Sequence, residues 1–215
     1  MVPVTRNVTL ERFLWACLIA ILAGVSGFSI WKIRDTSRAV QPLEPGPAPS
    51  IADLHRQVPD FSLVDQNGKT VTRADLAGQV WVADFFFTHC TGKCPMVTSR
   101  MADVQRAVPK EASVKLVSIT VDPERDSPAV LAKWAADYGA QDDRWLFLTG
   151  DKNDIIRLCK EGFLLPMGDN PSDHSFKLML VDRAGIIRGS FQGTDENEVA
   201  ELKKKIRSLA SENQP

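Results

Sequence analysis

A nearly continuous apolar run at residues 80–87 constrains the fold of this chain more than any other feature. The run, VWVADFFF, has the length of one strand and carries large apolar side chains at consecutive positions. Such a strand is typical of a sheet that is covered on both faces. A second strand pattern follows at residues 114–121, and between the two lies an apolar stripe at helical spacing: Val97, Met101, Val104 and Val108. The sequence therefore predicts a strand–helix–strand unit.

The remaining pattern extends this unit into an α/β domain. Three further helices are expected to begin near Ser127, Asp151 and Thr194, because each of these residues is a favoured helix cap. The other predicted strands form a first hairpin (61–64 and 70–72), a third strand of the sheet (145–148) and a late hairpin (177–181 and 186–188). Alternating strands and helices predict a parallel sheet, to which the late hairpin adds antiparallel strands.

The N-terminal part has the pattern of a membrane anchor. Residues 13–31 carry no charge, and at about 1.5 Å per residue they nearly cross a hydrocarbon core of roughly 30 Å. Trp15 and Trp31 lie near the two ends, where aromatic rings favour the headgroup boundary. A cleaved signal peptide is less compatible, because a small-residue cleavage site should follow the apolar run and the sequence there is Trp-Lys-Ile-Arg. We therefore predict one transmembrane helix.

These patterns divide the chain into four parts. Residues 1–12 form a short tail, residues 13–31 the transmembrane anchor, residues 32–58 a proline-rich tether, and residues 59–211 the folded domain. Basic residues flank the anchor on both sides, and their count weakly favours a cytoplasmic domain. The net charge of −1 lacks the basic excess of a nucleic-acid-binding protein, so no nucleic-acid partner is expected.

Two of the four cysteines form a close pair directly after the first buried run. Cys90 and Cys94 are separated by three residues, and Pro95 suits the first turn of a helix, so Cys94 is expected at the N-cap. The positive end of a helix and the charge of Lys93 favour thiolates there. A cysteine pair between the first long strand and a helix is typical of the redox site of a thioredoxin-like fold. Thiolates serve both disulfide exchange and Cu(I) binding.

The chain has three histidines that are candidate additional ligands. His55 lies in the tether, and His89 precedes Cys90 in an extended segment, so its side chain is expected to face away from that of Cys90. His174 follows an irregular stretch that contains Met167 and comes just before a predicted strand. Spacing alone does not select one of them as a metal ligand.

Several segments together resemble the Sco-type (SenC family) copper chaperones of cytochrome c oxidase assembly. They are FTHC-x-x-x-CP at residues 87–95, SITVDPERDSP at residues 118–128, DHS at residues 173–175 and LVD at residues 180–182. The resemblance implies that copper, as Cu(I) or Cu(II), binds to Cys90, Cys94 and His174. It also implies a membrane-anchored domain in the periplasm or the mitochondrial intermembrane space. The expected partner is the copper-bearing subunit of cytochrome c oxidase, whose dinuclear copper site the protein would load or prepare.

The sequence leaves a second function open. Cys90 and Cys94 also suit a thiol–disulfide oxidoreductase that acts on target cysteines without carrying copper. Only the copper chaperone needs His174 as a ligand, so this residue discriminates between the two functions. The loop Thr91-Gly92-Lys93 departs from the proline and aspartate that often follow the first cysteine in the family, and Lys93 places a positive charge beside the predicted metal.

Overall fold

The computed structural model describes residues 56–109, 112–141, 143–168 and 170–211. The predicted tail, the anchor at residues 13–31 and residues 32–55 of the tether lie outside the described residues. Within the described ranges, no helix is both long and apolar enough to cross a membrane. The transmembrane anchor therefore stays a prediction.

A five-stranded mixed sheet forms the centre of the domain, in the order β5-β4-β3-β6-β7. Its strands are β3 (Val80–Phe86), β4 (Val114–Thr120), β5 (Trp145–Leu148), β6 (Lys177–Val181) and β7 (Ile187–Gln192). Strand β4 runs parallel to both β3 and β5, whereas β6 is antiparallel to β3 and to β7. The α/β prediction, with an added late hairpin, is therefore confirmed in these residues.

Strand β3 is buried along its whole length. Because successive side chains point to opposite faces of a strand, Trp81 and Phe85 enter one apolar cluster while Val82 and Phe86 enter another. Each cluster needs its own covering layer, and this explains why the run at residues 80–87 shows no polar face. The expectation of a strand buried on both faces is confirmed.

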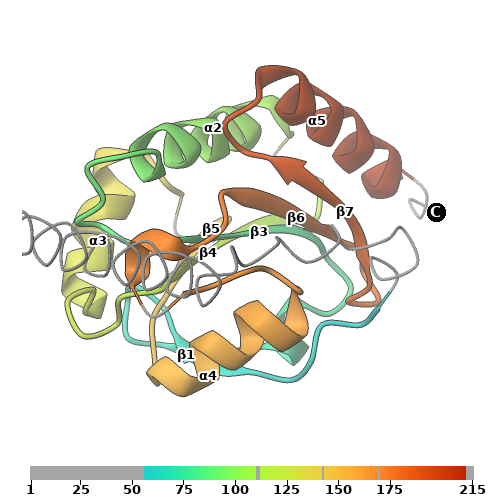
Figure 1. Ribbon diagram of the computed structural model, residues 1–215. Coiled ribbons are helices and arrows are strands. Elements are labelled where there is room, and N and C mark those ends of the chain that lie inside the picture. Colours follow the sequence, from blue (N-terminus) through green and yellow to red (C-terminus); the bar gives the residue numbers. More distant parts are fainter. Residues whose placement is uncertain (1–55, 110–111, 142, 169, 212–215) are drawn as a thin grey trace, which may run out of the picture. The chain divides into compact units, whose positions relative to one another are not determined.

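Helices cover both faces of the sheet (Figure 1). One face packs against α2 (Cys94–Ala107), α3 (Pro128–Asp137) and α5 (Glu196–Ser211). The other face packs against α4 (Lys152–Arg157), its continuation η3 (Leu158–Gly162) and the hairpin of β1 (Ser62–Val64) and β2 (Thr70–Thr72). Single 3-10 turns, η2 (Arg73–Leu76) and η4 (Pro171–Asp173), complete the element order.

The helix starts test the predicted caps. Asp151 caps α4 as expected, since its carboxylate accepts hydrogen bonds from the amides of Asn153 and Asp154. The prediction for Thr194 is wrong. Asp195 instead accepts from the amides of Asn197 (2.8 Å) and Glu198 (3.1 Å), because a carboxylate one residue closer to the helix reaches its free N–H groups better.

The turn between β6 and β7 depends on the buried carboxylate of Asp182. Its Oδ1 accepts hydrogen bonds from the amides of Ala184 and Ile186, both at 2.9 Å, and its Oδ2 accepts from Arg188 Nε at 2.6 Å. Gly185 has a φ of +78°, which an L side chain rarely adopts. The side chain of Asp182 therefore satisfies two turn amides and links the turn to Arg188 of the edge strand β7.

We predict that Asp182→Ala lowers the free energy of unfolding by about 1–3 kcal/mol, because two turn amides and the guanidinium of Arg188 lose a buried acceptor. Asp60→Ala serves as the matched control. Asp60 also pairs with an arginine, Arg73, at 2.7 Å, but its side chain is 86% exposed, so its loss should cost less than about 1 kcal/mol. Urea unfolding of both variants measures the difference, and equal losses would contradict the role given to Asp182.

Candidate metal centre

The cysteine pair lies where the chain leaves β3 and enters α2. Strand β3 ends at Phe86, and α2 begins at Cys94 itself. Lys93 occupies the N-cap with φ −88° and ψ −17°, so the predicted N-cap at Cys94 is one residue too late. The reason is that Lys93 already has helical backbone angles, which moves the helix start one residue toward the N-terminus.

The two thiols of the pair have opposite electrostatic environments. Burial opposes ionisation of Cys90, but hydrogen bonds from the Cys94 thiol and from the amides of Gly92, Lys93 and Cys94 lower the Cys90 pKa below its usual value. Cys94 is 1% exposed, and burial raises its pKa well above the usual range. Cys90 is therefore the more accessible and the more acidic of the two thiols, and Cys94 is the buried proton donor beside it.

The tertiary fold brings His174 to this pair across 80 residues of sequence. His174 directly follows η4 and is 5% exposed, and its Nε2 lies 3.3 Å from Cys94 Sγ. Its Nδ1 lies 2.8 Å from the carbonyl oxygen of Ser175. Because a carbonyl only accepts, Nδ1 must carry the proton, and the lone pair of Nε2 therefore points toward Cys94. Burial also lowers the pKa of His174, which favours the neutral imidazole.

Two aromatic rings enclose the imidazole of His174. The Phe87 ring meets it edge-on at 5.7 Å between centroids, and the Phe176 ring lies at 4.8 Å. The ammonium of Lys93 lies over the Phe176 ring, 5.5 Å from its centroid. The loop that carries the cysteines and the loop that carries the histidine are thus joined by aromatic contacts.

Other residues considered from the sequence lie elsewhere. His89 is exposed, and its Nδ1 contacts the Thr88 hydroxyl, as expected for a side chain that faces away. Met167 is buried in the apolar cluster that includes Trp81. Cys159 is fully buried in the same cluster, where burial raises its pKa to about 12. His55 lies outside the described residues.

Asp126 is a positioning residue that the sequence interpretation missed. Its buried carboxylate accepts hydrogen bonds from the Thr88 amide at 3.1 Å and from the hydroxyls of Thr88 and Thr120. It therefore ties the loop before Cys90 to the end of β4. The signal was the second aspartate of the segment DPERD at residues 122–126.

A second buried carboxyl, Asp84, lies on β3 beneath the site. Its Oδ1 accepts a hydrogen bond of 2.5 Å from Ser118, while its Oδ2 has no hydrogen-bond partner among the described residues. Burial raises the pKa of Asp84 to about 7, against the opposing effect of the Ser118 bond. Its charge in turn contributes to the raised pKa of Cys94.

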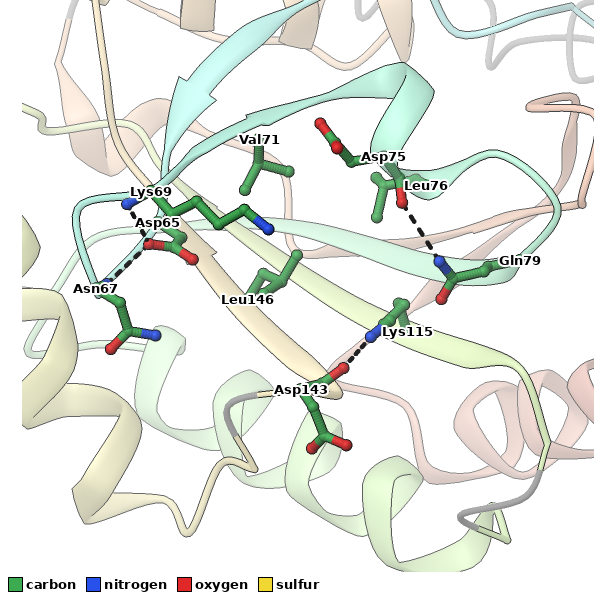
Figure 2. Close-up of a pocket in the computed structure, with 10 residues that line it drawn as sticks. All are labelled: Asp65, Asn67, Lys69, Val71, Asp75, Leu76, Gln79, Lys115, Asp143 and Leu146. Atoms are coloured by element: carbon green, nitrogen blue, oxygen red, sulfur yellow. Dashed lines mark hydrogen bonds between the residues drawn. The ribbon is translucent and has the colours of Figure 1, made fainter.

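A separate pocket of about 390 Å³ lies away from the cysteines (Figure 2). It is bordered by the β1–β2 hairpin, by η2 and by Lys115 and Leu146 of the sheet. Lys115 is near the amino end of β4, whereas Cys90 follows the carboxyl end of the parallel strand β3. Several of its polar groups are already paired: Lys115 donates to the Asp143 carbonyl, and Gln79 donates to the Asp75 carbonyl. None of the predicted site residues lines this pocket.

The chemistry available at the cysteine site is that of two sulfurs and one imidazole nitrogen. In the part of the chain that the structure describes, no three Cys, His, Asp or Glu side chains are already arranged to hold a metal ion. Cys94 and His174 are in contact, and the Cys94 thiol hydrogen-bonds the sulfur of Cys90. The donor set suits a soft metal, since thiolates and neutral imidazole both favour copper.

Comparison with known proteins identifies the family. The family described as SCO1/SenC matches residues 50–211, which is most of the chain. The chain belongs to the SCO1/SenC family. The SCO1 protein homolog of Bacillus subtilis is 32% identical over 164 residues, covering 74% of this chain and 85% of that protein. The family match thus includes all of the described site residues.

Solved Sco structures have the same fold. BsSco, a member of the Sco family of cytochrome c oxidase assembly proteins with a disulfide switch, is 31% identical with a TM-score of 0.67 and covers 74% of this chain and 96% of its own. Copper-bound ScoI of Bradyrhizobium japonicum is 30% identical with a TM-score of 0.56, covering 69% and 99%. The thioredoxin-like Sco fold predicted for the domain is therefore confirmed.

The relatives in the SCO1/SenC family include a lipoprotein and a mitochondrial protein. A family member from Bacillus anthracis is a lipoprotein; it is 29% identical with a TM-score of 0.68, covering 74% of this chain and 97% of its own. The human SCO2 homolog is mitochondrial; it is 38% identical over 139 residues, covering 59% of this chain and 50% of that protein.

We predict that iodoacetamide modifies Cys90 first and leaves Cys94 and Cys159 largely unmodified in the folded protein. Cys94→Ala removes one hydrogen-bond donor from the Cys90 sulfur, so the pKa of Cys90 should rise and its alkylation at neutral pH should slow by several-fold. Cys94→Ser keeps a hydroxyl donor and should slow it less. Mass spectrometry of time points across pH follows each site, and faster labelling of Cys94 than of Cys90 would refute the assignment.

A second prediction concerns the pH dependence of stability. The pKa of Asp84 is about 7 in the folded protein against 3.8 for an exposed aspartate, so the unfolded state releases its proton first as pH rises. The contribution of Asp84 to the free energy of unfolding should therefore be greatest below about pH 4 and should decline as the pH rises to about 7. Asp84→Asn should remove that decline and be more stable than wild type at pH 8. Denaturant titrations at several pH values measure the free energy of unfolding of both proteins. Parallel pH profiles for wild type and Asp84→Asn would contradict this prediction.

Proposed function

We propose that this chain binds copper through Cys90, Cys94 and His174 and takes part in cytochrome c oxidase assembly as a metallochaperone. The observation that carries the proposal is the orientation of His174, whose Nε2 lone pair points at Cys94 Sγ from 3.3 Å. With Nδ1 protonated, Nε2 is the imidazole nitrogen that can bind a metal, and it lies beside a second candidate ligand. The likeness to ScoI with copper bound supports copper as the metal.

The chemistry of the three donors fits Cu(I) and Cu(II) as cargo. Thiolates are soft ligands, and an imidazole with its other nitrogen hydrogen-bonded to a carbonyl is held in one orientation and made more basic. The Cys94 thiol, whose pKa is raised by burial, would lose its proton on binding, because the metal charge outweighs the cost of burying a thiolate. Copper affinity should therefore rise with pH.

Cys90 is the donor that must move for a three-coordinate site to form. Cys94 is on the first turn of a helix and His174 is packed between two rings, so both are held in place. Cys90 is only half-buried and lies on a loop that includes Gly92, whose amide reaches its sulfur. A rotation of Cys90 toward the other two donors would close the site, and the reverse rotation would expose copper to a competing thiolate on a partner.

The partner and location follow from the family rather than from the site. We propose that the partner is the copper-bearing subunit of cytochrome c oxidase and that the cargo is destined for its dinuclear copper site. Residues 13–31 would anchor the chain in a membrane, with the domain in the periplasm or the mitochondrial intermembrane space. The existence of a lipoprotein and of mitochondrial proteins among its relatives supports a membrane-associated location.

His174→Ala should lower copper affinity by at least tenfold while leaving oxidation and reduction of the cysteine pair largely intact, because only metal binding needs the imidazole. His89→Ala is the matched control, since His89 is exposed and precedes the same cysteine. Copper content, competition with a chromophoric chelator and the thiolate-to-Cu(II) absorption band provide the readouts. Unchanged affinity in His174→Ala, or an equal loss in His89→Ala, would rule out the ligand assignment.

A thiol–disulfide oxidoreductase is the second candidate, favoured by the opposite pKa shifts of the two cysteines. The Cys90 thiolate would attack a target disulfide to give a mixed disulfide and one released target thiolate. Cys94 would then lose its proton and displace the second target thiolate, leaving a Cys90–Cys94 disulfide and a target reduced by two electrons. Target reduction at full rate by a copper-free protein, with no stable copper complex, would favour this function.

A further inference from the structure

We propose that Lys93 is a specificity-determining residue of the copper site, where its positive charge favours Cu(I) over Cu(II). This inference rests on the proposed copper site and concerns the oxidation state of the cargo. Lys93 belongs to neither the donor set nor the hydrophobic core, and the functions above do not explain its contacts. The backbone amide of Lys93 contacts the sulfur of Cys90, and its ammonium contacts Phe176, the ring beside His174.

The main chain of Lys93 is in contact with the first sulfur donor. It forms the N-cap of α2, and its amide donates a hydrogen bond to the sulfur of Cys90. It also immediately precedes Cys94 in the chain. The backbone of Lys93 therefore belongs to the loop that carries both sulfurs, and its side chain starts next to Cys94.

The ammonium of Lys93 is held on the histidine side of the site. It lies 5.5 Å from the centroid of the Phe176 ring, and this ring is 4.8 Å from the imidazole of His174. An ammonium over an aromatic face is attracted by the ring quadrupole, which limits how far it swings into solvent. The charge is consequently kept beside the aromatic ring that contacts the imidazole of His174.

Among the residues that the structure describes, the charge of Lys93 is not paired with a carboxylate. Within the described ranges, Lys93 forms no ion pair, whereas Arg100, Arg125 and Lys152 all pair with carboxylates. The buried carboxyl of Asp84 acts on Cys94, whose pKa it raises, and forms no ion pair with Lys93 among the described residues. The ammonium is exposed, so solvent screens its effect without cancelling it.

Charge counting gives the direction of the effect. Two thiolates and a neutral imidazole give the site a charge of −1 with Cu(I) and 0 with Cu(II). A fixed cation repels Cu(II) twice as strongly as Cu(I) at the same distance. Addition of one electron to Cu(II) gives Cu(I) with no proton transferred, so the cation should raise the reduction potential of the bound copper.

The test compares Lys93→Gln, Lys93→Arg and Lys205→Gln in the copper-loaded protein. Lys205 of α5 is a control with a similar ring contact, since its ammonium lies 5.3 Å from the centroid of the Phe191 ring. Affinities for Cu(I) and for Cu(II) are measured separately with chelator competition, and the potential is measured by mediated redox titration. Lys93→Gln should lower the Cu(I)-to-Cu(II) affinity ratio by about three- to tenfold, where tenfold corresponds to about 59 mV for one electron.

Lys93→Arg should keep the ratio near the wild-type value, Lys205→Gln should leave it unchanged, and higher ionic strength should shrink the Lys93→Gln effect. An unchanged ratio in Lys93→Gln, or an equal change in Lys93→Arg, would overturn the proposal while the copper site itself stands. If wild-type protein holds no copper of either state, the proposed function fails and this inference fails with it.

Discussion

Burial of β3 between two apolar clusters is the constraint on which the rest of the structure depends. The strand has no exposed face, so other elements must pack on both sides of it, and the loop that follows its carboxyl end carries the cysteines. That loop emerges beside the end of the parallel strand β4. Asp126 can therefore bond Thr88 and Thr120 together and hold the loop in one position.

The electrostatics of the site follow from this placement. A loop that enters a helix directly presents several free amides to Cys90, and these stabilise its thiolate despite partial burial. Cys94, one helical residue inside, is covered by the core and keeps its proton. The same geometry therefore produces one reactive and one protected sulfur, which suits both metal exchange and disulfide exchange. Lys93 and His174 are the residues whose properties separate these two uses.

His174 reaches the cysteines because the antiparallel strand β6 lies next to β3 in the sheet. The loop before β6 must then end near the loop after β3, and the Phe87 and Phe176 rings fill the space between them. The site is thus assembled from two loops that share one edge of the sheet. Its ring contacts and its hydrogen bond to Ser175 leave the imidazole little freedom, whereas Cys90 remains half-exposed.

The sequence by itself determined the order of strands and helices, the buried nature of residues 80–87 and the position of the cysteine pair at a helix start, because these depend on local periodicity and capping. His174 became a candidate only through the family resemblance, since a lone loop histidine carries no local signal. Tertiary structure alone decided the contacts of Asp126, Asp84 and Phe176 and the cap at Asp195 rather than Thr194. These depend on distances between segments far apart in sequence or on backbone angles, which no periodic pattern specifies.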